Sequence, residues 1–508
     1  MDLSPRLRAV CDLNVAEVRE GGRHEYDGKP QDLSPEGVRA GLARLASARA
    51  EGEPEPDPHD EAQLAAREEN ARVVYADLEL HRRNPVLHLA ELDLSCYDRD
   101  YAPAAERAAA RAEHLGAWPR AVEAAVSALD QVSSPVAQAL VGAVRGLAAG
   151  LADEPGDAVR EAALAAHARL VAHVEQAAAH GDPDPALGPA GLAALMSSAE
   201  ATLADLDALA QQADTERDRL HALLADGCAR VTPGRPALEV ARELVREHPD
   251  GAGVIDAARV WTQRVIEFTR DRDLVPYHDG VCLVGLSPPS RRWAMAMMSS
   301  AAPGEPEGPS WYHITPPDES WPEQEQEEWL EVFSDTTLPG ITLHEVAPGH
   351  FSHGRALRRL TSPVRAFVVS SAFVEGWAHY AEEMAVEEGF GADDPKIAIG
   401  VWLEALVRVT RLACAIGVHT AGMTVQEAAR RFEADTHLSG PAALSEASRA
   451  TFDPTYGRYT WGKLEILRLR ERARKDWGTG FTLQRFHKAL MDLGSPSLGL
   501  LSTAVDRG

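Results

Sequence analysis

The residues most able to do chemistry form the segment HEVAPGH at 344–350. In a His-Glu-x-x-His helix, two imidazoles lie one turn apart on one face, beside a glutamate that can activate metal-bound water. Here His350 comes six residues after His344, which on a straight helix would turn the two side chains about 120° apart. Pro348 interrupts helical hydrogen bonding and Gly349 accepts unusual backbone angles. The pattern therefore predicts a bulged helix that brings both imidazoles to one cation, with Glu345 as general base.

A third metal ligand is expected from the segment FVEGWAHYAE at 373–382. Glu375, His379 and Glu382 are spaced i, i+4 and i+7, so on a helix they form one polar stripe among apolar and aromatic residues. A carboxylate added to two histidines leaves one position open for water, as in catalytic zinc sites. We predict Glu375 as the third ligand, with Glu382 as the alternative. His379 and Glu382 are otherwise expected to support the ligands or to contact substrate.

The elements that must position these residues are predicted to be mostly helices. The first half is rich in alanine, leucine, arginine and glutamate with helical spacing, as in 106–114, 120–129 and 157–179. Short β-favouring stretches at 281–286, 293–298 and 310–314 predict a small antiparallel sheet beside the metal-binding helix. The fold class is therefore mainly α, a large helical bowl. We divide it into an N-terminal helical region, 1–250, and a catalytic region, 251–508, which could also form one compact unit.

The composition excludes several partners. The 508-residue chain is 45% hydrophobic and carries a formal charge of −27, which disfavours nucleic acid and anionic membrane surfaces as partners. It has neither a secretory signal pattern nor an apolar run of membrane-spanning length, so we expect a cytoplasmic protein. The five cysteines are scattered and are expected to be reduced thiols. The oligomeric state is not indicated.

Three segments resemble the bacterial family called domain of unknown function 885, whose members look like zincin-type metallopeptidases. They are HEVAPGH, EGWAHYAEE at 375–383 and TYGRYTWGKLEILRLRERA at 455–473. The resemblance covers the whole chain in layout, but only the C-terminal half carries recognisable motifs. It implies a zinc ion and the following roles: His344, His350 and Glu375 as ligands, Glu345 as base and Tyr459 as a late tyrosine of the site. The chain departs from the family after His350, where Phe351-Ser352-His353 stands in place of a histidine and a glutamine, so the role of His353 stays open.

The function expected from this resemblance is hydrolysis of a peptide or small amide by metal-activated water, with Glu345 moving the proton. The oxyanion of the tetrahedral intermediate needs a hydrogen-bond donor. Tyr459 is the first choice, and the competing candidates are His419, His437, Tyr456 and Arg458. Arg458 could instead bind a substrate carboxylate with its bidentate fork.

Two readings from other classes stay open. A non-haem iron oxygenase uses the same set of two histidines and one carboxylate, although it has no need of a glutamate after the first histidine. A helical binding protein without catalysis could also keep this fold. Metal analysis distinguishes the three.

Overall fold

The computed structural model describes residues 1–151, 157–288, 291–292 and 294–508. The chain is mainly α-helical, as predicted from the sequence. The described helices of the first half are α1 (Pro5–Cys11), α2 (Val15–Glu20), α3 (Pro35–Glu51), α4 (Pro58–Arg72), α5 (Leu80–Arg83), α6 (Pro85–Leu92), α7 (Ala104–Ala128), α8 (Ser134–Gly146), α9 (Ala158–His180), α10 (Gly188–Glu200), α11 (Leu206–Val231), α12 (Ala237–Leu244) and α13 (Gly253–Asp271).

The second half holds a small sheet followed by more helices. The strands are β1 (Cys282–Leu286), β2 (Ala296–Ser299) and β3 (Ser310–Ile314). The described helices that follow are α14 (Glu323–Leu330), α15 (Leu338–Glu345), α16 (His350–Leu357), α17 (Pro363–Phe367), α18 (Ser371–Glu387), α19 (Pro395–Thr420), α20 (Val425–Asp435), α21 (Gly440–Phe452), α22 (Arg458–Trp477), α23 (Leu483–Met491) and α24 (Ser502–Arg507).

The sheet is mixed, which corrects the prediction that it is antiparallel. Its order is β1-β3-β2, with β1 parallel and β2 antiparallel to the central β3. Along β3, Tyr312 and Ile314 are buried while Trp311 is exposed, so the strand has the alternation of a sheet with one face on the core. Alternation identifies the strands and their faces, but it carries no information on strand direction. The predicted second strand began at Trp293, which lies outside the described residues, and β2 begins at Ala296.

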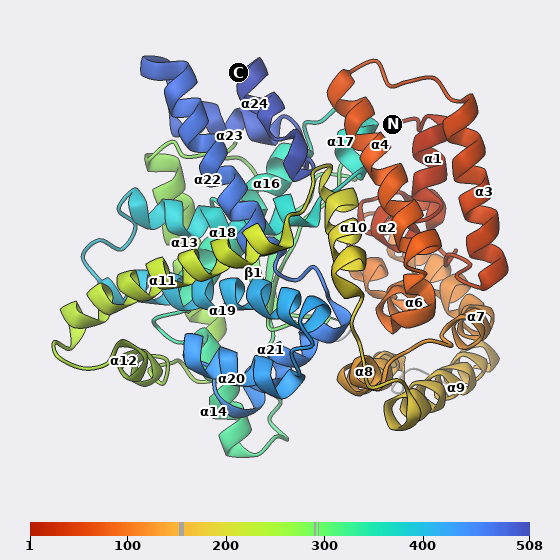
Figure 1. The fold of residues 1–508 in the computed structure, drawn as a ribbon, viewed down its shortest axis with the longest axis horizontal. Helices are drawn as coiled ribbons and strands as arrows, with labels where there is room; N and C mark the ends of the chain where they lie inside the picture. Colours follow the sequence, from red (N-terminus) through yellow and green to blue (C-terminus); the bar gives the residue numbers. More distant parts are fainter. Residues whose placement is uncertain (152–156, 289–290, 293) are drawn as a thin grey trace.

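The N-terminal helices form one side of the molecule, and the rest of the chain forms the other (Figure 1). Helix α10 stands between the two parts and contacts both α4 and α19. The largest core cluster includes residues from Leu192 to Val505. A smaller cluster joins Leu7 and Leu64 of the N-terminal helices to Val364 and Val368. The division at residue 250 stays a prediction.

Helices α18 and α22 cross with their backbones almost in contact. A Cβ atom on Gly462 would lie 1.9 Å from the carbonyl oxygen of Ala372, and one on Gly376 would lie 2.5 Å from the Cα of Gly462. Glycine in a helix interior costs about 1 kcal/mol relative to alanine. Here it allows the close crossing that sets the start of α22 against the segment of α18 that holds Glu375.

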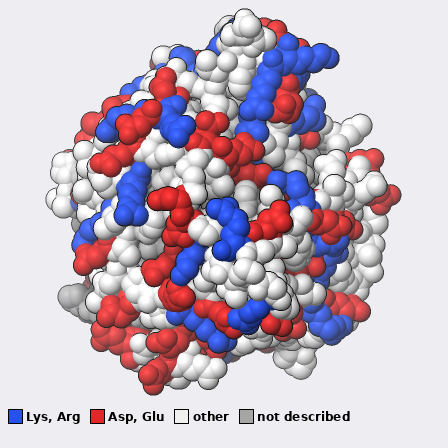
Figure 2. Space-filling view, turned by 90° about the vertical axis from the view of Figure 1, so that its left-hand side faces the viewer, with Lys and Arg blue, Asp and Glu red and all other residues white. Residues whose placement is uncertain are grey.

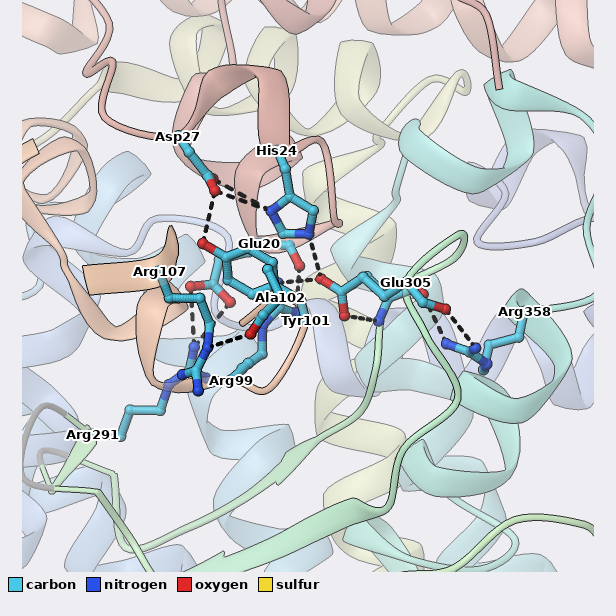
Figure 3. A network of polar contacts seen from close by, with 11 residues as sticks. Glu20, His24, Asp27, Arg99, Tyr101, Ala102, Arg107, Arg291, Glu305 and Arg358 are labelled. Atoms are coloured by element: carbon cyan, nitrogen blue, oxygen red, sulfur yellow. Dashed lines mark hydrogen bonds and ion pairs between the residues drawn. The ribbon is translucent and has the colours of Figure 1, made fainter. Parts of the chain in front are cut away.

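A polar network connects the N-terminal helices to the loop between β2 and β3 (Figure 3). Buried Glu305 of that loop contacts His24 Nε2 at 3.0 Å and accepts from Arg99 Nη2 at 2.9 Å. Arg358, the C-cap residue of α16, donates to the carbonyl oxygens of Ala302 and Glu305, each at 2.9 Å. The loop thus ties α16, the helix that begins with His350, to the first hundred residues.

The surface mixes both signs of charge. On the face shown in Figure 2, basic and acidic side chains are interspersed rather than gathered into one large field. None of the described helices combines the length and the apolar character needed to cross a membrane.

Candidate metal centre

The motif at 344–350 forms two helices with a short break rather than one bulged helix. Helix α15 ends at Glu345 and α16 begins at His350, with a bend and a turn between them. Gly349 is required in the break because a Cβ atom there would lie 1.9 Å from the carbonyl oxygen of His344. The indole Nε1 of Trp377 donates to the carbonyl oxygen of Pro348 at 3.0 Å, so α18 holds the break in place. The chain turns enough at the break for both imidazoles to meet.

The two histidines converge on one carboxylate oxygen. Glu375 Oε2 lies 3.5 Å from His344 Nε2 and 3.6 Å from His350 Nε2. Ligand atoms about 2.0–2.1 Å from a tetrahedral zinc are about 3.4 Å apart, so these separations fit one ion among the three atoms. Burial raises the pKa of Glu375, but the two histidines hold it well below its ordinary value. The carboxylate is therefore ionised, as a metal ligand must be.

Glu345 belongs to the same cluster with a different contact pattern. Its carboxylate lies within 4.8 Å of ligand atoms of His344 and His350, so distance alone also permits it as a ligand. We favour Glu375 as the ligand because its oxygen lies close to both Nε2 atoms at once. Glu345 is buried, and its Oε2 has no hydrogen-bond partner among the described residues. A buried carboxylate oxygen without a partner is costly, which suggests that a water or substrate group completes this site.

Glu382 lies behind His344 and is not a ligand in this arrangement. Its Oε1 is 2.6 Å from His344 Nδ1, and its Oε2 accepts from Arg408 Nη1 at 2.8 Å. Burial and Arg408 lower the pKa of His344, whereas Glu375 and Glu382 raise it, to about 9. When His344 donates from Nδ1 to Glu382, the Nε2 lone pair faces Glu375 and is free for a metal. His379 is buried, its Nδ1 lies 3.7 Å from Glu382, and burial lowers its pKa to about 3.

Tyr459, in the first turn of α22, stands beside the ligands. Its ring stacks on that of His344, with centroids 6.3 Å apart and planes 27° apart. Its hydroxyl makes no hydrogen bond to any described residue, so it is free to donate to a bound group. Three guanidinium groups surround the ring at 5.3–6.0 Å from its centroid, those of Arg408, Arg411 and Arg458. Burial, and next the charge of Glu375, raise the pKa of Tyr459, which keeps the phenol protonated.

Arg458 lies near the ligands, but one end of its fork is already occupied. Nη1 and Nη2 each donate to Asp453 at 2.7 Å. Burial lowers the pKa of Arg458, while Asp453, Tyr459 and Glu375 raise it above its ordinary value. The guanidinium therefore stays charged within the electrostatic reach of Glu375.

His419 is not brought to the cluster. It follows Arg408 by eleven residues on α19, about 16 Å along the helix axis. Its Nε2 lies 2.8 Å from the Ala450 carbonyl oxygen and its Nδ1 accepts from the Leu187 amide, so both ring nitrogens are engaged by main chain. It lines a different cavity of about 640 Å³. The proposed catalytic role of His419 is therefore not supported by this geometry.

Two other candidates also have structural partners. Tyr456 is fully buried and donates to the carbonyl oxygen of Glu446 at 3.3 Å. His353 is buried with Nε2 3.1 Å from the carbonyl oxygen of Gly494, and burial lowers its pKa to about 4. His353 is thus a neutral side chain of α16 that faces the main chain at Gly494.

Sequence reasoning missed the contribution of α19. Glu404, Arg408 and Arg411 interrupt a long apolar helix at i, i+4 and i+7, the same spacing as Glu375, His379 and Glu382. A charged stripe on an otherwise buried helix needs partners, so this signal was present in the sequence. What the sequence could not provide was the identity of those partners.

Comparison with known proteins places the chain in a fold and a family. It superposes on a structure described as a putative lipoprotein of unknown function from Shewanella oneidensis with a TM-score of 0.77 and 20% identity, over 98% of this chain and 97% of that one. A structure described as the putative lipoprotein from Colwellia psychrerythraea gives a TM-score of 0.78 and 16% identity, over 100% of this chain and 99% of that one. At these identities the likeness concerns the fold alone. A search of curated proteins finds no match.

These comparisons correct the expected location. Both of these structures are described as putative lipoproteins, which contradicts the prediction of a cytoplasmic protein. That prediction used only the absence of recognisable targeting patterns, which is weak ground for a location. The family model for bacterial proteins of unknown function called DUF885 matches residues 17–505. Because the match covers nearly the whole chain, this protein belongs to the DUF885 family.

Proposed function

We propose that this protein is a zinc-dependent hydrolase of the zincin type that cleaves peptide or related amide bonds. The observation that carries the proposal is the convergence of two imidazole nitrogens on Glu375 Oε2, at 3.5 and 3.6 Å, beside the unpartnered Oε2 of Glu345. Two histidines and one carboxylate leave a coordination position open, as catalysis requires.

The residues present fit a zinc ion. His344, His350 and Glu375 would hold it, and Glu382 would fix the tautomer of His344 through Nδ1. When bound, zinc would supply a Lewis acid for the scissile carbonyl and acidify a water molecule in the same site. The buried, unpartnered oxygen of Glu345 is the group available to take a proton from that water.

The remaining steps use side chains of the chain itself. Glu345 accepts the proton and then passes it to the leaving amine nitrogen, serving as base and as acid in turn. The free hydroxyl of Tyr459 donates a hydrogen bond to the developing oxyanion. The three arginines around Tyr459 add positive charge near that oxygen. A hydrolytic role for Glu345 is what distinguishes this proposal from an iron oxygenase with the same ligands.

Elemental analysis of the purified protein tests the metal site. We expect about one zinc per chain in the wild type and loss of that zinc in His344→Ala, His350→Ala and Glu375→Ala, because each variant removes one of three ligands. His353→Ala is the matched control, since this neighbouring histidine faces Gly494. Iron in place of zinc would favour the oxygenase. Absence of metal after reconstitution would favour the helical binding protein.

Glu382→Gln is expected to weaken zinc binding about 10- to 100-fold, because the partner of a ligating histidine sets its orientation and basicity. Competition with a chromogenic chelator measures this change. Glu387→Gln serves as the control because it lies on the same helix and pairs with Arg470. Unchanged affinity in Glu382→Gln would contradict the role assigned to this carboxylate.

A further inference from the structure

We propose that a cavity one helical turn from Glu375 binds a carboxylate, so that the preferred substrates end in a free carboxylate one or two residues beyond the scissile bond. The link to catalysis rests on the proposed function. The cavity has a volume of about 110 Å³ and is lined by residues that include Arg67, Glu200, Ser371, Thr455, Arg458 and Trp461. Since a water molecule takes about 30 Å³, this space suits a carboxylate group with little water beside it.

The cavity adjoins the metal centre through two helices. Ser371 and Glu375 are four residues apart on α18, so they share one face and lie about 6 Å apart along the axis. Arg458 is followed directly by Tyr459, whose ring stacks on His344. Successive Cα atoms in a peptide are about 3.8 Å apart. A substrate carboxylate in the cavity therefore lies one or two residues from a carbonyl at the metal centre.

Arg458 has hydrogen-bond donors that its protein partners do not use and that a ligand can accept from. Asp453 takes the end of the guanidinium formed by Nη1 and Nη2, and Thr455 Oγ1 accepts a second bond from Nη1 at 3.0 Å. The Nε atom of Arg458 makes no hydrogen bond to a described residue. It is also not one of the fully buried atoms without a partner, so a ligand can reach it. The side edge formed by Nε and Nη2 is thus open, and this edge matches the two oxygens of a carboxylate.

Arg67 approaches the cavity from the N-terminal helices. Its Nη2 donates to Asn14 Oδ1 at 2.9 Å and pairs with Glu17. No hydrogen bond from its Nε or Nη1 to a described residue is found. Ser371 is exposed at the start of α18, and its hydroxyl also makes no such bond. Three side chains with free donors therefore meet at one small cavity.

Glu200 is the acidic side chain in this wall, and its surroundings limit its repulsion of an anion. Its Oε2 accepts from the Ser370 hydroxyl at 2.7 Å and from the Leu498 amide at 3.0 Å. Burial raises the pKa of Glu200 to about 7, although Arg67 and Arg458 act to lower it. With a proton, this carboxyl group can donate to a bound carboxylate instead of repelling it.

The N-terminal helices contribute two residues to the wall of this cavity. Arg67 on α4 and Glu200 on α10 come from the part of the chain that holds none of the proposed metal ligands. They close the cavity against α18 and α22. A site closed in this way favours release of a short C-terminal fragment over cleavage in the middle of a long chain.

Calorimetry tests the subsite with acetyl-Ala-Ala-Ala and its C-terminal amide as probes, titrated into Glu345→Gln protein as purified and after zinc loading. We expect the free acid to bind about 10- to 100-fold more tightly than the amide, as for other hydrogen bonds between charged groups. Arg67→Gln added to this protein should abolish the preference. The matched control is Arg72→Gln, which lies on the same helix and pairs with Glu69 and Asp77. Equal affinities, no binding of either probe, or a preference that survives Arg67→Gln would each overturn the subsite.

The same pair of probes separates this inference from the proposed function. The wild type could hydrolyse neither probe while Glu345→Gln protein prefers the free acid and loses that preference with Arg67→Gln. This result would support the carboxylate subsite and contradict the proposed hydrolase. If the wild type hydrolyses the amide as fast as the acid, the hydrolase stands and the subsite does not.

Discussion

Replacing Glu345 by glutamine is expected to lower the rate of amide hydrolysis about 100- to 10,000-fold while the zinc content stays unchanged. Glutamine has nearly the same shape as glutamate but cannot accept a proton at neutral pH. The three ligands are untouched, and Glu375 Oε2 still lies 3.5 and 3.6 Å from the two histidines. The measurement compares product formation by mass spectrometry on a mixed peptide library with zinc content from elemental analysis.

The control for this experiment is Glu327→Gln, a change on an exposed face of α14. It should leave both hydrolysis and zinc content at wild-type values. Full activity in Glu345→Gln would remove the general base from the mechanism. Loss of zinc together with activity would show that Glu345 is a ligand, which its distance from the histidines also permits.

Replacing Lys463 by methionine is expected to destabilise the fold by about 3–5 kcal/mol, because it leaves buried carboxylates without a partner. Lys463 is fully buried, donates to Glu216 Oε1 at 2.9 Å and pairs with Glu383. Arg219 contacts both carboxylates, at 2.7 and 2.8 Å, but it cannot neutralise two charges. These contacts join α11 to α18 and α22, the two helices that carry Glu375 and Tyr459.

The loss of stability in Lys463→Met depends on pH, because it depends on the ionisation of the buried carboxylates. Burial raises the pKa of Glu383, but Lys463 and Arg219 lower it to about 2 from an ordinary value of 4.5. A lowered folded-state pKa contributes stability that is complete above the unfolded value and is lost as pH falls through the folded value. The wild type should therefore lose this stability between pH 4.5 and about 2. Without Lys463 the pKa of Glu383 is less depressed. The difference in unfolding free energy between the wild type and Lys463→Met should therefore become smaller as the pH falls.

Thermal unfolding followed by calorimetry across this pH range checks the prediction. Lys475→Met is the matched control because Lys475 is exposed on the same helix. It should unfold within about 0.5 kcal/mol of the wild type. A Lys463→Met protein as stable as the control at neutral pH would show that Arg219 alone is enough to compensate the two carboxylates.

The sequence was sufficient for the parts of the site that depend on local spacing. The glycine and proline between His344 and His350 predicted a departure from a straight helix, and the structure has one, although it is a break between two helices. The stripe of Glu375, His379 and Glu382 is on one helix as the i, i+4, i+7 spacing requires. On the same helix, Gly376 packs directly against Gly462 of α22.

Residue type and spacing favoured Glu375 as the third ligand but left Glu382 as an alternative, because both carboxylates lie on the same helical stripe. The structure separates Glu375, which faces both Nε2 atoms, from Glu382, which reaches the opposite nitrogen of His344. That separation depends on the crossing angle of α15 and α18. A crossing angle is set by side-chain packing between helices far apart in the sequence.

By itself, the sequence determined the fold class and the family, because helical periodicity and short motifs are local properties of the chain. Only the tertiary structure decided that Arg408 approaches His344, that His419 lies away from it, and that Arg67 and Arg458 line one cavity. These are contacts between segments tens to hundreds of residues apart, and they exist because α10, α18, α19 and α22 pack around one another. No local pattern encodes such packing, since it is the combined result of every buried side chain.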